Sequence, residues 1–138
     1  MMTIFEKIIK REIPSYIVYE DDLVIAFLDI SQVTKGHTLV VPKKPYVNVF
    51  ELDDNTAAHL FKVVVKVSKA LKKAFNLEGL NIVNNNGKLA GQAVFHYHIH
   101  LIPRYPNDDF LMKGVNHNSE YTKEDFLKLK ELIINAQS

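Results

Sequence analysis

Hydrophobic and polar positions alternate between residues 94 and 103, which read Val-Phe-His-Tyr-His-Ile-His-Leu-Ile-Pro. A period of two is typical of a β-strand, whose successive side chains point to opposite faces of the sheet. The pattern therefore predicts three histidines on one face and four apolar side chains on the other: His96, His98 and His100 against Phe95, Tyr97, Ile99 and Leu101. Pro103 lacks a backbone N–H group, so we expect strand pairing to end there.

The rest of the chain has the patterns of three helices and four more strands. Apolar residues recur every three or four positions in the helical segments, and the longest segment carries lysines on its opposite face. We expect helices over residues 3–11, 53–75 and from 122 onward, and strands over residues 16–20, 23–29, 37–42 and 79–84. This order of elements indicates an α+β fold with a five-stranded antiparallel sheet.

Three aligned imidazoles have three possible uses. The Cα atoms of the outer two lie about 13 Å apart along a strand, so the full triplet is poorly suited to one tetrahedral zinc ion, although two histidines with a distant ligand remain an option. Structural histidines are common singly, but three on one face make that the less favoured interpretation. We favour nucleophilic catalysis, because neutral imidazole is a good nucleophile near its usual pKa of about 6.5 and its second nitrogen needs a partner that fixes the tautomer.

The segment just before the histidines, residues 84–93, is a loop that contains Gly87 and Gly91. Glycine lets the backbone approach a ligand closely, and the N–H groups of such turns can bind an anion. Two glycines alone indicate only a turn. Because the loop adjoins the histidines, we predict that it holds a phosphate.

The loop and the histidines together resemble the signature of the histidine triad (HIT) superfamily, specifically its Hint-like branch of nucleotide-phosphate hydrolases and transferases. The matching pattern is Asn85-x-Gly87-x-x-x-Gly91-Gln92-x-Val94-x-His96-x-His98-x-His100. Other matching segments follow in the branch's order, including Glu12-Ile13-Pro14, Ala26-Phe27-x-Asp29-Ile30 and Gly36-His37-x-Leu39-Val40-x-Pro42-Lys43. The resemblance covers about residues 3–105, and the tail from 106 to 138 has no comparable motif. We expect one HIT domain over residues 1–138.

The resemblance implies a HIT-like fold, a homodimer whose two sheets join edge to edge, a purine nucleotide substrate and no cofactor. It implies a covalent nucleotidyl-histidine intermediate on His98, with phosphate oxygens held by His100, orientation by His96 and support from His37. The implied substrate contacts are Asp29 at the ribose, Ile4, Phe5, Ile8, Phe27 and Ile30 around the base, and Asn85, Gly91, Gln92 and Ala93 on the phosphate side. Spacing alone would make Asp29 a turn or cap residue and His37 a structural histidine.

The sequence departs from the family's pattern at a metal site and in the phosphate loop. Many bacterial relatives bind a structural zinc ion through two cysteines, a histidine after the Pro-Lys pair and the first triad histidine. This chain has Thr3, Glu6 and Pro45 at the first three of those positions, so we expect no such zinc. Ala93 stands where some animal members have a serine, which leaves the handling of the leaving group open.

The composition limits the location and the partners. The 138 residues carry a net charge of +1, which gives no field that favours nucleic acid or a membrane surface, and they include no cysteine. No apolar segment suggests a signal peptide or a membrane span, so we expect a cytoplasmic protein. Three rival functions remain: a Fhit-like dinucleoside polyphosphate hydrolase, a nucleotide-binding scaffold with slow turnover, and, last, a metal-dependent hydrolase.

Overall fold

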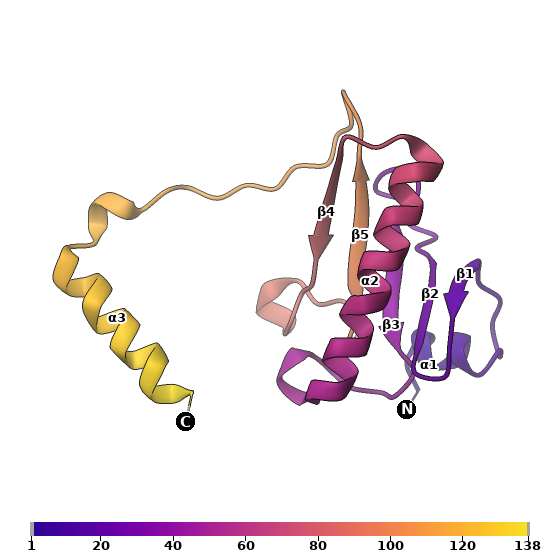
Figure 1. Cartoon of the computed structure of the whole chain (residues 1–138), viewed down its shortest axis with the longest axis horizontal. Coiled ribbons are helices and arrows are strands. Elements are labelled where there is room, and N and C mark those ends of the chain that lie inside the picture. Colours follow the sequence, from indigo (N-terminus) through magenta and orange to yellow (C-terminus); the bar gives the residue numbers. More distant parts are fainter. Residues whose placement is uncertain (1, 138) are drawn as a thin grey trace.

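A five-stranded antiparallel sheet forms the centre of the molecule (Figure 1) in the computed structural model, which describes residues 2–137. The strands are β1 (Ile17–Glu20), β2 (Val24–Leu28), β3 (Thr38–Pro42), β4 (Gly79–Val83) and β5 (Ile99–Arg104), in the spatial order β1-β2-β3-β5-β4. The helices are α1 (Ile4–Ile9), α2 (Asp54–Phe75) and α3 (Lys123–Ala136), with 3₁₀ turns η1 (Val49–Glu51), η2 (Lys88–Ala90) and η3 (Asn118–Glu120). The predicted α+β class and five-stranded antiparallel sheet are confirmed.

The two faces of the sheet are covered by different helices. Along β2, Val24 and Ala26 point into a core formed with α2, whereas Ile25 and Phe27 point into a second core that contains Phe5 of α1. Because both faces are covered, β2 and β3 are almost continuous apolar runs. The α1 side has the smaller core and faces the cavity described below.

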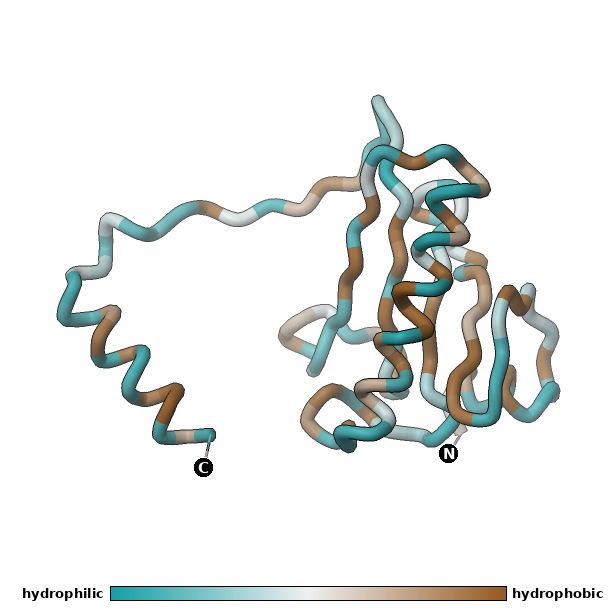
Figure 2. Tube along the Cα trace, viewed as in Figure 1, coloured by the Kyte–Doolittle hydropathy of each residue, from teal (hydrophilic) through white to brown (hydrophobic). Residues whose placement is uncertain are grey.

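Helix α2 is held against the sheet by one apolar stripe. Its first turn is capped by Asp53, whose side chain accepts the Thr56 N–H, and it ends at Asn76 in the left-handed conformation. Figure 2 shows how apolar and polar positions alternate along it, in keeping with one buried and one solvated face. The buried residues are Leu60, Val63, Val64, Val67 and Leu71. Each such side chain contributes about 1.5–3 kcal/mol by leaving water.

Strand β5 begins later in the sequence than the alternation predicts. It begins at Ile99, and residues 94–98 lie outside the sheet ladder. The neighbouring β3 ends at Pro42, which has no N–H to donate, and the Pro42 carbonyl is occupied by the His96 side chain. The Tyr97 N–H instead donates to the Tyr46 carbonyl. The two-sided pattern still holds, because Tyr97 and Ile99 are buried in the core under α2 while the histidines face α1.

Two other details of the predicted strand were wrong. Pro103 does not end the pairing: it lies opposite Leu80 within β5. Strand β3 starts at Thr38, opposite Leu101, so at the level of Pro103 no ladder bond to β3 is lost. Phe95 is half-exposed rather than part of the core.

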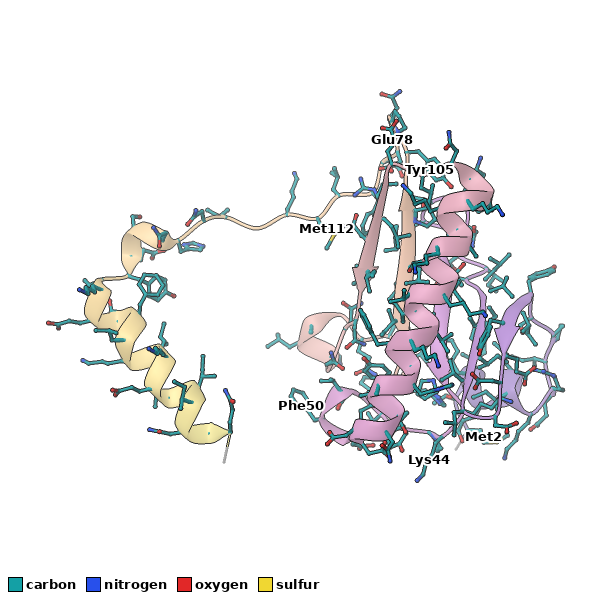
Figure 3. All side chains as sticks on the ribbon, viewed as in Figure 1. Met2, Lys44, Phe50, Glu78, Tyr105 and Met112 are labelled. Carbon is teal, nitrogen blue, oxygen red and sulfur yellow. The ribbon has the colours of Figure 1, made fainter. Side chains whose placement is uncertain are left out.

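The chain beyond β5 leaves the sheet as an extended arm and ends in α3, well separated from the rest of the molecule (Figure 1). The expected helix is present, and its capping box pairs Thr122 with Asp125 in both directions. No residue of α3 is buried, and its side chains project into open space (Figure 3). No helix among residues 2–137 is long and apolar enough to cross a membrane.

Candidate active site

A cavity of about 420 Å³ opens on the α1 side of the sheet. A volume of this size is within the range of small-molecule sites, and its wall is mostly apolar with a few polar groups. The lining residues are Ile4, Phe5, Ile8, Ile13, Pro14, Ser15, Phe27, Leu28, Asp29, Ile30, Ser31, Leu39, Ala93, Val94, His98 and His100. The predicted base-side residues, the ribose-side aspartate and two of the three triad histidines therefore meet in one place.

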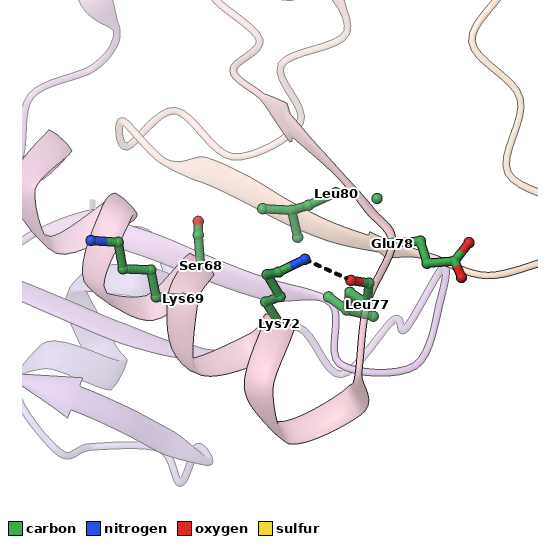
Figure 4. A pocket seen from close by; sticks show the side chains of 7 residues that line it. Ser68, Lys69, Lys72, Leu77, Glu78 and Leu80 are labelled. Atoms are coloured by element: carbon green, nitrogen blue, oxygen red, sulfur yellow. Dashed lines mark hydrogen bonds between the residues drawn. The ribbon is translucent and has the colours of Figure 1, made fainter.

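A second hollow lies behind the sheet, between the end of α2 and the start of β4 (Figure 4), and measures about 270 Å³. Its polar side chains are Ser68, Lys69, Lys72 and Glu78, and Lys72 Nζ donates to the Leu77 carbonyl at 3.1 Å. No histidine lines it. The groups suited to nucleophilic chemistry are in the cavity under α1.

His98 is fixed in one tautomer by a backbone carbonyl. Its Nδ1 lies 2.8 Å from the His96 carbonyl, which can only accept, so Nδ1 carries the proton and Nε2 keeps its lone pair. The backbone at His98 is held in turn by Asn84, whose Nδ2 donates to the His98 carbonyl at 2.9 Å. Phe5 packs edge-on against the imidazole, with ring centroids 4.9 Å apart. His98 is thus oriented with a free nitrogen in the cavity wall.

His96 is fully buried and does not line the cavity. Its Nε2–H donates to the Pro42 carbonyl at 2.7 Å, and its Nδ1 has no hydrogen-bond partner. The contact joins β3 to the segment that carries His98. His96 is therefore placed to orient the backbone carbonyl on which the His98 tautomer depends.

His100 and His37 form a pair at the other side of His98. The His98 and His100 rings lie 4.9 Å apart between centroids, and His100 Nδ1 is 2.9 Å from His37 Nε2. His37 is buried at the start of β3, where its Nε2 also lies 3.6 Å from Asp29 Oδ2. With its Nδ1 engaged by His37, His100 can turn only its Nε2 toward a ligand in the cavity.

Asp29 follows the last residue of β2 and is held by the turn behind it. Its Oδ1 accepts the Ser31 N–H at 2.8 Å, which leaves Oδ2 on the side of His37. Gln32 closes the same loop: its Nε2 donates to the His37 carbonyl and its Oε1 accepts the Gly36 N–H. Gly36 has φ +93°, and a Cβ there would come within 2.8 Å of the Phe75 ring, so the turn needs glycine.

Burial keeps the histidines uncharged. It lowers the pKa of His98 below the usual value, although the hydrogen bond to the His96 carbonyl acts in the opposite direction. It lowers the pKa of His100 to about 4, with His98 and His37 adding like-charge repulsion. Burial also lowers the pKa of His37 and of His96, against the pull of Asp29 and Glu6 respectively. At neutral pH each of the four rings is therefore neutral, with a proton on one ring nitrogen and a lone pair on the other.

The glycine loop is arranged differently from the expectation. The Gly87 N–H donates to Gln92 Oε1 at 2.8 Å, and the Gly91 and Gln92 N–H groups are satisfied within the loop. Asn85, Gly91 and Gln92 do not line the cavity, whereas Ala93 and Val94 do. Gln92 Nε2 donates to the carbonyls of Val47 and Val94, so its buried side chain holds the segment that reaches the cavity.

Sequence reasoning missed the residues that brace the site. Ser31 and Gln32 brace Asp29 and His37 within one turn, and Asn84 donates to the His98 carbonyl from the neighbouring strand end. Of these residues, Asn84 could most easily have been predicted, because the antiparallel pairing of β4 and β5 places it next to the histidine segment.

Residues 10–107 match the family model described as the HIT domain. The chain belongs to the HIT family. It is 51% identical to Protein hit of Bacillus subtilis over 94% of this chain and 90% of that protein. It is 42% identical to adenosine 5'-monophosphoramidase hnt1 of Schizosaccharomyces pombe, over 80% and 79% of the two chains, and 39% identical to adenylylsulfatase HINT3 of Arabidopsis thaliana, over 76% and 53%. The predicted superfamily is confirmed.

Solved structures of HIT family proteins share the fold. The structure of a Bacillus subtilis HIT family member superposes with a TM-score of 0.95 at 49% identity, covering 98% of this chain and 96% of that one. A HIT family protein from Bacillus anthracis gives 0.93 at 51% identity, covering 96% and 95%. A zinc-bound histidine triad protein from Mycobacterium smegmatis gives 0.74 at 33% identity, covering 85% of each chain.

The residues of this chain do not fit the structural zinc site of bacterial relatives. Thr3 and Glu6, at the cysteine positions, form the capping box of α1, in which each side chain accepts the other's backbone N–H. Pro45 has no side-chain ligand atom. Of the four positions only His96 Nδ1 and the Glu6 carboxylate could still ligate zinc, and two ligands fall short of the four that a structural zinc site uses.

Proposed function

We propose that this HIT family protein is a nucleotide hydrolase or transferase that acts on purine nucleoside phosphoramidates or related nucleotidyl substrates through a covalent intermediate on His98. The names of two relatives, an adenosine 5'-monophosphoramidase and an adenylylsulfatase, support this class of substrate. The observation that carries the proposal is the His98 side chain. Its Nδ1 proton is committed to the His96 carbonyl, so its Nε2 lone pair faces the cavity that also contains Asp29 and His100.

In the first step, His98 Nε2 attacks the α-phosphorus. A bond forms from phosphorus to Nε2 as the bond to the leaving amine breaks, and the amine takes up a proton as it departs. The charge that develops on the imidazole is spread toward the His96 carbonyl, which already accepts the Nδ1 proton. In the second step, water attacks phosphorus, the bond to Nε2 breaks, and a nucleoside monophosphate leaves.

The other two histidines of the cluster have supporting roles in this mechanism. His100 presents Nε2 to the phosphate oxygens when His37 Nε2–H donates to its Nδ1, which is the tautomer that makes His100 Nε2 a donor. The Val33 N–H, 3.4 Å from His37 Nδ1, supports that arrangement. His96 acts through its backbone carbonyl rather than by contact with the substrate.

The nucleoside occupies the apolar part of the cavity. Asp29 Oδ2 accepts hydrogen bonds from the ribose hydroxyls, since its Oδ1 is already engaged by Ser31. The base lies among side chains of α1 and β2 and their neighbours: Ile4, Phe5, Ile8, Phe27 and Ile30. On the phosphate side, Ala93 contacts the substrate directly, and Asn85, Gly91 and Gln92 shape the loop that positions it.

The test is to trap the intermediate. Rapid acid quenching of the protein with adenosine 5'-phosphoramidate, followed by intact-mass measurement, should show one adenylyl group per chain. His98→Ala should lose the adduct and at least about a thousandfold in kcat, as expected for removal of a nucleophile, while still binding AMP. His117→Asn, a histidine on the extended arm, is the matched control and should turn over normally. Undiminished turnover by His98→Ala would refute the assignment.

The name of one relative, adenylylsulfatase, supports sulfate as a second candidate leaving group. Sulfate leaves without needing a proton, which suits a site with Ala93 where some relatives have a hydroxyl. Comparing kcat/KM for adenosine 5'-phosphoramidate, adenosine 5'-phosphosulfate and a diadenosine polyphosphate ranks the alternatives. A preference for the last would favour the Fhit-like function, and AMP binding without any adduct would favour a scaffold.

We also infer a homodimer. Strand β4 is an edge of the sheet, and its side chains are half-buried with Ile82 exposed. An uncovered edge of this kind can pair with a second sheet. Joining two β4 edges would give one continuous sheet and leave both cavities open on the α1 side.

A further inference from the structure

Three atoms of the kind that ligate metals meet at the border of the cavity, from three separate segments. His37 Nε2 lies 2.9 Å from His100 Nδ1 and 3.6 Å from Asp29 Oδ2, and all three atoms are within 4.8 Å of one another. Nitrogen ligands at about 2.0–2.1 Å from a tetrahedral zinc ion lie about 3.3 Å apart. The distance of 2.9 Å is slightly shorter than this value and that of 3.6 Å slightly longer. Small side-chain movements therefore bring the three atoms around one ion.

The surroundings of these ligands are those of a supported metal site. Ligating imidazoles commonly donate their second N–H to a backbone carbonyl, and ligating carboxylates are themselves hydrogen-bonded. The Ser31 carbonyl lies 3.3 Å from His37 Nδ1, and the Ser31 N–H donates to Asp29 Oδ1 at 2.8 Å. One residue therefore orients two ligands, with His37 Nε2 and Asp29 Oδ2 left to face each other.

The charge of the cluster also suits a cation. The set combines two imidazoles, of which His37 is buried, with one carboxylate. The Asp29 carboxylate adds a negative charge to the set. Two imidazoles and one carboxylate form a ligand set used for zinc, with a fourth position open toward the cavity.

We propose that Asp29, His37 and His100 bind a divalent transition-metal ion of the zinc class, and that this ion excludes a nucleotide from the cavity. The site is separate from the zinc position of bacterial relatives at Thr3, Glu6 and Pro45. The ion is an inhibitor rather than a cofactor, because it occupies the Asp29 Oδ2 that would otherwise accept the ribose hydroxyls. Metal binding stands independently of the proposed function, and only the exclusion of nucleotide rests on it.

Cobalt(II) tests the site directly, since it replaces zinc and has visible absorption bands. Titration of the metal-free, full-length protein should give one bound Co²⁺ per chain with the intense bands of a four- or five-coordinate ion. Asp29→Asn and His37→Asn should each weaken binding at least tenfold. His98→Asn and His59→Asn, histidines outside the ligand set, should stay within about twofold of the wild type. Circular dichroism shows that each variant is folded.

Two results of this titration would overturn the metal site. One is no Co²⁺ binding by the wild type at millimolar metal. The other is unchanged affinity in folded Asp29→Asn, which would place the ion elsewhere, for example at the exposed His117 and Glu120 pair.

Adenosine tests the exclusion, because it has the ribose and base but no phosphate to chelate the metal. Increasing adenosine should raise the apparent Kd for Co²⁺ in proportion to its own occupancy. Simultaneous binding of both would overturn the exclusion. Failure of adenosine to bind the metal-free protein would overturn the exclusion and the proposed function together, while a Co²⁺ site lost in Asp29→Asn would still stand.

Discussion

Burial and one carbonyl contact set the protonation state of His98. Because burial lowers its pKa, the neutral ring with a free Nε2 persists below pH 6.5. We predict that kcat/KM for a nucleoside phosphoramidate is level near neutral pH and falls as pH decreases, with a midpoint below 6.5. Since the histidines interact, the midpoint belongs to the cluster rather than to His98 alone. A pH–rate profile between pH 4 and 8 measures it.

The same histidines make the protein less stable in acid, so folding must be followed at each pH. A folded pKa below the unfolded one means that the unfolded chain binds more protons, and stability falls as pH decreases from about 6.5 toward the folded pKa. His117→Asn should share the wild-type midpoint. A midpoint at or above 6.5 in protein that is still folded would contradict the prediction.

At the residue scale, the sequence indicated histidines that line the cavity but not the residues that hold them. An alternation of period two was enough to place His98 and His100 together, because a side chain's face depends only on local backbone geometry. The brace at Gln92 depends on the carbonyl of Val47, which is brought close only by the tertiary fold. No spacing within residues 84–100 reports that contact.

Helix α2 and the first hairpin are joined by a contact that links elements far apart in sequence. Asp21 accepts hydrogen bonds from Tyr19 and from the Leu23 and Val24 N–H groups, and its Oδ2 lies 2.7 Å from His59 Nε2 on α2. Those hydrogen bonds hold the Asp21 pKa well below its usual range, despite burial. We predict that His59→Ala lowers the free energy of unfolding by about 1 kcal/mol, measured by urea denaturation.

His117 provides the matched comparison, because it also pairs with a carboxylate. Its partner Glu120 is three residues away, and both side chains are more than half exposed. His117→Ala should change stability by less than about 0.5 kcal/mol. Equal effects of the two substitutions would show that the Asp21 contact adds nothing to the packing of α2 on the hairpin.

At the element scale, helix ends were predictable and one strand end was not. The caps of α2 and α3 follow from local side-chain chemistry: Asp53 accepts the Thr56 N–H, and Thr122 accepts the Asp125 N–H. The start of β5 depends on its neighbours: pairing with β3 stops at Val40 and Ile99 and pairing with β4 stops at Val83 and His100, although the alternation continues back to residue 94. Alternation alone cannot show where the adjacent strand stops.

At the scale of the whole molecule, the extended position of the arm and α3 needs an explanation from outside a single chain. Residues 105–138 are about a quarter of the sequence, yet a crystal structure of a relative superposes over 98% of the chain with a TM-score of 0.95. That score requires the relative's arm to extend in the same way. The apolar side chains of α3 are exposed in a single chain, including Phe126, Leu129, Leu132 and Ile133.

We infer that a second copy covers α3, because an exposed amphipathic helix held in a shared position needs an apolar surface to contact. Phe50 of η1, which lies on the side of the molecule nearest α3 (Figure 3), offers an exposed apolar receiving surface, and Leu89 of η2 is also fully exposed. We predict a dimer in sedimentation velocity experiments. Burying a leucine or isoleucine side chain contributes about 1.5–3 kcal/mol, so Leu129→Glu with Ile133→Glu should raise the dimer Kd at least about tenfold.

A further substitution on α3 serves as the control for the added negative charge. Lys130→Glu introduces a carboxylate at the edge of the apolar stripe, beside Phe126 and Ile133, and should leave the dimer Kd within about threefold, because a rim charge contributes little. The double variant should keep the wild-type unfolding midpoint of the core, since no residue of α3 is buried in its own chain. Wild type that sediments as a monomer at all concentrations, or a double variant as dimeric as Lys130→Glu, would mean that α3 is not held by a second copy. In that case the arm's position would have to be set within the chain, by contacts such as that of Arg104 with Asp108 at its base.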